Sequence, residues 1–228
     1  MLKNERAEPV RGALGAGRRP SPVSIMRMSG LKPIIALSTG MAVLYALTAA
    51  IWTGRPLEVV ALVIAGLLLW TFLEYLLHRW MLHWEPERPA QRMIRRCFPS
   101  HRSHHDAPSK ERRNVKLQLR ITASLSLILT AFLILIGVPA IVALSVNAGV
   151  LLGYQAYEYV HVACHHLPMR NAWAARLKHH HAIHHHRDET VNFGVTTTVW
   201  DSVFGTMWKP EAASATAGPQ MIRQGRPV

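Results

Sequence analysis

Long stretches without any charged residue constrain the fold of this 228-residue chain more than any other feature. Residues 33–54 are long enough to cross a hydrocarbon core of about 30 Å as a helix. Residues 59–73, with their apolar flanks, form a second such segment. Residues 121–157 contain 37 positions without a charge, too many for one helix and enough for two, with a turn at Gly137-Val138-Pro139. We therefore predict four transmembrane helices, at about 33–54, 57–77, 119–136 and 139–160.

The positive charges lie at the ends of these predicted spans. Lys and Arg gather in residues 3–32, 79–120 and from 170 onward, which accounts for the net charge of +13. The positive-inside rule then places both termini and the loop between the second and third spans in the cytoplasm. Nucleic-acid binding is not favoured, because no recognition motif accompanies the charges. Residues 1–30 and 209–228 have the composition of disordered segments, which leaves residues 31–208 as one membrane domain.

The histidines are concentrated in one part of the chain: all 14 lie between His78 and His186. Ten of them form four groups: His78 and His83; His101, His104 and His105; His161 and His165; and His181, His184 and His185. Residues three or four apart share a helix face, whereas residues five apart are displaced by about 140°. The last three groups therefore have same-face spacing. His78 and His83 do not, and they either straddle a helix end or serve different metals.

The longest histidine run occupies positions 179–186, with only two interruptions. On a helix, His181, His184 and His185 point one way, with His180 at the margin of this triplet. His179 and His186 point away. The run therefore supplies three predicted ligands rather than six.

Ten imidazoles exceed what one tetrahedral ion can use, so the count favours two metal ions. Imidazole ligation permits zinc, iron, copper or nickel, and the scarcity of thiolates excludes iron–sulfur clusters. The two cysteines, Cys97 and Cys164, are expected to be reduced, with Cys164 a small buried residue.

Two roles are possible for the carboxylates near the histidines. Glu74 precedes His78 by four residues, and Glu158 precedes His161 by three. Each either accepts a hydrogen bond from a ligand ring or pairs with an arginine at the membrane edge. Asp106, Asp188 and Asp201 are weaker candidates for the first role.

The assembled motifs resemble the fatty acid hydroxylase superfamily, which includes fatty acid 2-hydroxylases, sterol C4-methyl oxidases and sterol desaturases. The similar segments are, in order, FLEYLLHRWMLH, SHRSHH, GYQAYEYVHVACHH, LKHHHAIHHH and NFGVTTTVWDSVFGT. The resemblance implies an all-α integral membrane protein with four transmembrane helices under a cytoplasmic, histidine-rich helical cap that holds a dimetal site. The implied ligands are His78, His83, His101, His104, His105, His161, His165, His181, His184 and His185. His166 and His180 are not included in this implied ligand set. Residues 192–206 are expected to close over the site.

The resemblance also implies the chemistry. Two iron ions, for which zinc can substitute in purified protein, would use O2 to hydroxylate an unactivated C–H bond of a membrane lipid. No haem, flavin or iron–sulfur module is recognisable in the sequence, so electrons are expected from a separate protein such as cytochrome b5, a ferredoxin or a reductase.

Several alternatives stay open from the sequence. A lipid desaturase or carotenoid hydroxylase would share these motifs, and the lipid could be a fatty acyl chain, a sterol, a carotenoid or a hopanoid-like molecule. A zinc-dependent lipid hydrolase needs fewer histidines, so the number of predicted ligands disfavours this alternative. A histidine-rich metal transporter would carry polar ligands within its spans. Residues 33–57 and 121–153 contain no histidine or acidic residue, which argues against a metal path through the membrane.

Overall fold

The computed structural model describes residues 22–84, 104–105 and 115–210. Regular structure within these residues is entirely helical, as predicted. The long helices are α1 (Pro22–Thr53), α2 (Pro56–Leu76), α5 (Val115–Leu135) and α6 (Ala140–His166). A π-helical segment, η2 (Leu77–Leu82), continues α2, and two shorter helices, α7 (Ala172–His186) and α8 (Val199–Val203), follow α6.

Each long helix contains a segment long and apolar enough to cross a membrane. These segments are Leu31–Thr53, Pro56–Leu82, Gln118–Leu135 and Ala140–His166. Large apolar side chains such as Leu44, Leu68 and Ile128 are exposed on the outside of the bundle, as expected of surfaces that face lipid. The four apolar helices therefore agree with a multi-pass membrane protein.

The start of α1 differs from the sequence prediction. We predicted residues 22–30 to be part of a disordered segment, but they are helical: α1 begins at Pro22. Proline is well tolerated there, since an N–H at the first helical position would have no partner within the helix. Just beyond, Leu31 and Ile34 are buried beside Val162 of α6, which anchors this end of α1. The remaining residues of the predicted disordered segments, 1–21 and 211–228, lie outside the described residues.

Helix α6 is the centre of the bundle, because it contacts α1, α2, α5 and α7. Its closest approach is to α2. A Cβ atom on Gly149 would collide with the carbonyl oxygen of Val63, and one on Gly66 would collide with that of Val146. Small residues at such crossings let two membrane helices pack backbone against backbone. The glycines thus fix the relative position of the two helices whose ends carry His78 and His161.

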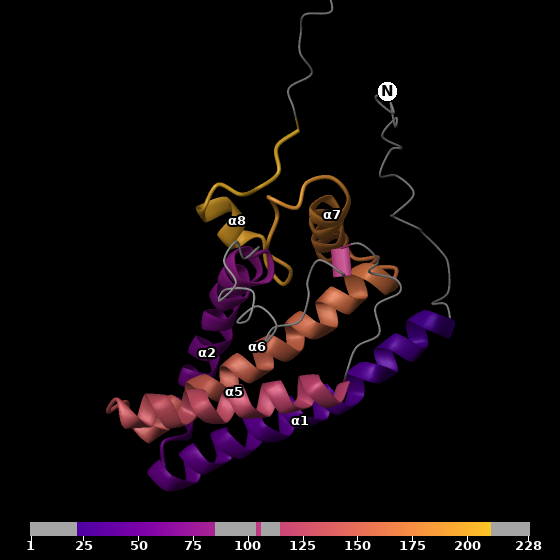
Figure 1. Ribbon diagram of the computed structural model, residues 1–228. Coiled ribbons are helices and arrows are strands. Elements are labelled where there is room, and N and C mark those ends of the chain that lie inside the picture. The colour runs from indigo at the N-terminus through magenta and orange to yellow at the C-terminus, as the bar shows by residue number, and fades with distance from the viewer. Residues whose placement is uncertain (1–21, 85–103, 106–114, 211–228) are drawn as a thin grey trace, which may run out of the picture.

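The short helices lie at one end of the bundle, where α2 and α6 end (Figure 1). In Figure 1, α7 lies beside the end of α6 and α8 beside the end of α2. The indole of Trp200 in α8 donates a hydrogen bond to Thr71 of α2 at 3.0 Å. Connections α1–α2 and α5–α6 are at the opposite ends of these helices. Histidines at the ends of α2 and α6 are consequently brought next to those of α7.

Candidate metal centre

Nine of the ten predicted ligands lie in two groups at this end of the bundle. Each histidine offers one ring nitrogen, and the nitrogen atoms within a group lie within 4.8 Å of one another. The tenth, His101, lies outside the described residues. The five-histidine group consists of His104, His161, His165, His181 and His185, and the four-histidine group of His78, His83, His105 and His184.

In the five-histidine group, ring nitrogens from separate segments face one another. Nε2 of His104 lies 2.9 Å from Nε2 of His161 and 3.1 Å from Nε2 of His165. Nε2 of His181 lies 3.0 Å from Nε2 of His165. Two imidazoles bound to one ion at about 2.0–2.1 Å and at angles of about 90–110° have nitrogen atoms about 2.8–3.4 Å apart. The observed spacing therefore fits a shared metal ion.

The four-histidine group has the same spacing. Nε2 of His83 lies 3.0 Å from Nε2 of His184. The ring centroid of His184 is 4.6 Å from that of His78 and 4.8 Å from that of His105. This group also fits one metal ion.

The π-helical segment explains why His78 and His83 meet. On an α-helix, residues five apart do not share a face, but the i→i+5 hydrogen bonds of a π-helix bring such residues onto neighbouring turns. His83 is the C-cap of η2, and its ring centroid is 5.2 Å from that of His78. The two histidines therefore straddle a helix end and lie in the same group.

The two groups are adjacent because neighbouring residues divide between them. His104 and His185 belong to the five-histidine group, whereas His105 and His184 belong to the four-histidine group. The rings of His105 and His185 stack with centroids 4.1 Å apart, which joins the groups. The predicted same-face triplet of α7 thus contributes to both groups, and the arrangement fits a pair of ions.

Burial keeps the ligand rings in the form that binds metals. Burial and neighbouring imidazoles lower the pKa of His105 to about 3. Burial also lowers the pKa of His184, to about 4. The pKa values of His181 and His185 are lowered well below the ordinary value by the same two causes, burial first. These imidazoles are neutral near pH 7, as a metal ligand must be.

The other histidines of the long run have different surroundings. His179 and His186 are exposed, in agreement with their predicted direction. His180 is buried, and its Nε2 donates a hydrogen bond to Asp201 at 3.0 Å. It is absent from both groups of described residues that could hold a metal ion.

The chain after α7, which we call the closing segment (residues 191–208), orients two rings of the four-histidine group. Nδ1 of His184 donates to the carbonyl oxygen of Val191 at 2.7 Å, and Nδ1 of His78 donates to that of Phe193. A carbonyl only accepts, so each ring carries its proton on Nδ1 and leaves Nε2 available to a metal. Sequence reasoning missed these partners, because a backbone carbonyl has no signature in residue type.

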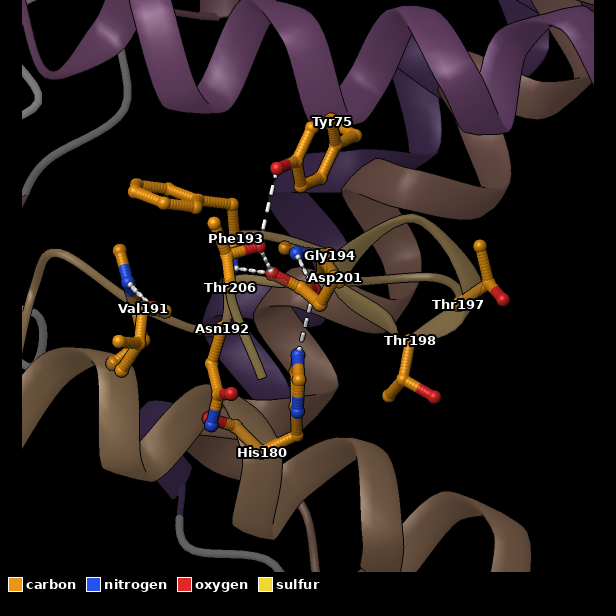
Figure 2. A network of polar contacts seen from close by, with 12 residues as sticks. Tyr75, His180, Val191, Asn192, Phe193, Gly194, Thr197, Thr198, Asp201 and Thr206 are labelled. Atoms are coloured by element: carbon orange, nitrogen blue, oxygen red, sulfur yellow. Dashed lines mark hydrogen bonds and ion pairs between the residues drawn. The ribbon is translucent and has the colours of Figure 1, made fainter. Parts of the chain in front are cut away.

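Two of the predicted partner carboxylates, Glu74 and Asp201, contact the backbone of the closing segment. Glu74 accepts from the backbone N–H groups of Val195 and Thr196 at 2.7 and 2.8 Å. Asp201 accepts from the N–H groups of Phe193 and Gly194, both at 2.8 Å (Figure 2). Burial acts to raise the pKa of Asp201, but hydrogen bonds from His180, Thr206 and Gly194 outweigh it and lower the pKa. This carboxylate is therefore ionised at neutral pH.

The other predicted carboxylates have different surroundings. Asp188 accepts from the backbone and hydroxyl of Thr190. Glu158 is buried on α6, and Asp106 lies outside the described residues. A carboxylate that the sequence did not single out, Glu189, lies 3.9 Å from Nδ1 of His105.

The profile described as fatty acid hydroxylase matches residues 63–206, which include all nine clustered histidines and most of the closing segment. The chain belongs to the fatty acid hydroxylase family. The resemblance predicted from the five motifs is thereby confirmed.

Several relatives in the fatty acid hydroxylase family are similar to this chain. The fatty acid 2-hydroxylase of Mus musculus is 32% identical over 154 residues, 67% of this chain and 41% of the relative. The ceramide very long chain fatty acid hydroxylase scs7 of Schizosaccharomyces pombe is 33% identical over 161 residues, 68% of this chain and 44% of the relative. Dihydroceramide fatty acyl 2-hydroxylase FAH1 of Arabidopsis thaliana is 32% identical, over 66% of this chain and 62% of the relative.

A solved structure supports the same fold. Full-length scs7p, of which only the hydroxylase domain is visible, aligns with a TM-score of 0.60 and 25% identity, covering 90% of this chain and 72% of that one. This chain of the fatty acid hydroxylase family spans about two fifths of the length of its mouse and fission yeast relatives.

Proposed function

We propose that this chain is a membrane-bound, non-haem di-iron oxygenase that hydroxylates a fatty acyl chain with O2 and external electrons. The observation that carries the proposal is the pair of adjacent histidine groups, which lie within the region shared with the family. The relatives carry the names fatty acid 2-hydroxylase and dihydroceramide fatty acyl 2-hydroxylase, so we propose C2 of a ceramide-type acyl chain as the position attacked.

The proposed ligands are the nine clustered histidines together with His101. Bound iron would supply the activation of O2 and the removal of hydrogen from the C–H bond. The protein would supply neutral imidazoles at fixed positions and a largely buried site, with most ligand rings shielded from water. One oxygen atom enters the product, and the other leaves as water with electrons from a separate donor protein.

We also propose that the site faces the cytoplasm. The basic blocks flank the ends of the spans that carry the histidines, which favours this orientation. A lipid could then approach from the bilayer while a soluble or membrane-bound electron donor approaches from the aqueous side.

The test is metal analysis of the purified protein, followed by incubation with reductant, isotopically labelled O2 and a dihydroceramide. We expect two ions per chain and one labelled oxygen atom in a 2-hydroxyacyl product. A double bond in the product would indicate a desaturase instead. A single ion per chain, or product formation without O2, would contradict the proposal.

A further inference from the structure

The closing segment is attached to one of the two histidine groups through its backbone. Carbonyl oxygens of Val191 and Phe193 accept hydrogen bonds from His184 and His78, which are both members of the four-histidine group. The ring of Phe193 lies against the same group, with its centroid 5.7 Å from that of His83 and 5.5 Å from that of His184. The position of this short stretch of backbone therefore affects where these imidazoles point.

Two buried carboxylates determine the position of that stretch. Asp201 is 0% exposed and receives four hydrogen bonds: two from backbone N–H groups of the closing segment, one from the hydroxyl of Thr206 at 2.7 Å and one from His180 at 3.0 Å. Figure 2 shows Asp201 surrounded by Gly194, Thr206 and His180. The bond to His180 connects the segment to α7, which also carries His184.

Glu74 makes the corresponding connection to α2. Its side chain is buried, and it receives the N–H groups of Val195 and Thr196 together with the hydroxyl of Thr196. His78 follows Glu74 by one helical turn. The same helix thus supplies both a ligand ring and the carboxylate that anchors the backbone to which the ring is bonded.

The space around Asp201 is closely filled. A Cβ atom on Gly194 would collide with the carbonyl oxygen of Thr197 and would lie 2.9 Å from Oδ2 of Asp201. The hydroxyl of Tyr75, on α2, lies 3.1 Å from that of Thr206. The carboxylates therefore act on a tightly packed segment rather than on a loose loop.

We propose that Asp201 and Glu74 are positioning residues that fix the closing segment so that Val191 and Phe193 aim His184 and His78, and that they thereby set the metal affinity of the four-histidine group. The inference rests on the proposed function, because it requires two ions. Hydrogen bonds to metal-bound histidines are worth about 10–100-fold in metal affinity. Loss of either carboxylate should selectively weaken binding of the ion in the four-histidine group.

The experiment titrates the metal-free full-length protein with Co²⁺ in detergent, against a competing chelator, and records the absorption of the bound ion at each step. Variants His83→Ala and His161→Ala assign the steps, because each removes a ligand from a different group. The test variants are Asp201→Asn, which replaces one acceptor oxygen with an N–H₂ group, and Glu74→Leu, which removes both. Glu74→Gln retains an acceptor oxygen for the two backbone N–H groups and serves as the conservative replacement.

We expect Asp201→Asn and Glu74→Leu to weaken the step assigned to the four-histidine group by about 10–100-fold and to leave the other step unchanged. Glu74→Gln should restore most of the affinity. Retention of the ion in the five-histidine group also shows that a variant is folded. As a matched control, Glu58→Gln changes an α2 carboxylate that pairs with Arg55 at the end of the helix away from the histidines, and it should leave both steps unchanged.

The inference is overturned if wild-type protein binds two ions and both test variants retain them with unchanged affinity, or if the variants weaken both steps equally. The proposed function still stands after either result. Fewer than two ions in the wild-type protein would contradict the proposed function as well.

Discussion

At the scale of single residues, two nearby histidines of α7 should respond oppositely to substitution. His184 is 0% exposed and belongs to the four-histidine group, whereas His186 is exposed. We expect His184→Ala to lose one ion and to reduce hydroxylation by more than about 100-fold, since removing a ligand costs more than removing its hydrogen-bond partner. His186→Ala should retain both ions and the hydroxylation activity. Metal analysis and product formation measure the effects, and equal losses would show the assignment to be wrong.

The buried imidazoles also predict how pH affects the metal-free protein. An imidazole in the unfolded chain titrates near pH 6.5, whereas the folded pKa values are about 3 for His105 and about 4 for His184. The unfolded state therefore binds more protons below pH 6.5, and stability falls as the pH falls from 6.5 toward those lower values. Each of the two histidines should lower the free energy of unfolding by about 2 kcal/mol at pH 5 relative to pH 7.5.

Thermal unfolding of the metal-free protein in detergent at the two pH values measures this effect. The melting temperature should be lower at pH 5. A variant with His105 replaced by Gln should show a smaller difference between the two pH values, because one titrating group is absent. An equal or higher melting temperature at pH 5 would contradict the expected neutral state of the rings.

At the scale of elements, the crossing of α2 and α6 should tolerate no added volume. A Cβ atom on Gly149 meets the backbone carbonyl of Val63, which cannot rotate away as a side chain could. We expect Gly149→Ala to destabilise the protein by about 1–3 kcal/mol. Gly40→Ala on α1 is the control, because a Cβ atom there has nothing within 4 Å. Melting temperatures of the two variants should therefore differ, and similar values would argue against close packing at Gly149.

The type of each long element was predictable, but one local helix geometry was not. Uncharged runs of sufficient length predict membrane-crossing helices wherever they occur, because a helix satisfies its own backbone hydrogen bonds. The change from α- to π-helix over Leu77–Leu82 has no comparable signal in residue type. It alters which residues share a face, and so the relation between His78 and His83 could not be read from spacing alone.

At the scale of the whole molecule, the distribution of basic residues predicts the orientation in the membrane. One basic block runs into the first turns of α1, a second runs from η2 to the start of α5, and a third follows α6. We expect a reporter fused to either terminus to lie in the cytoplasm. A cysteine substituted for Thr53, at the α1–α2 connection, should react with a membrane-impermeant thiol reagent added from outside. Labelling of Thr53→Cys only after the membrane is opened would contradict this orientation.

Linear patterns were sufficient to predict the class of the protein and the histidines that cluster in the structure. Uncharged runs specified four apolar helices, and histidine spacing together with the five motifs selected the residues that gather at one end of the bundle. These features are local, so a linear pattern is sufficient to detect them. The division of the histidines into two groups depends on how the helices pack. His104 and His105, like His184 and His185, are neighbours in sequence but belong to different groups. The tertiary structure also decided that Glu74 and Asp201 bind the closing segment, because contacts between residues as far apart as Glu74 and Val195 depend on how the helices pack.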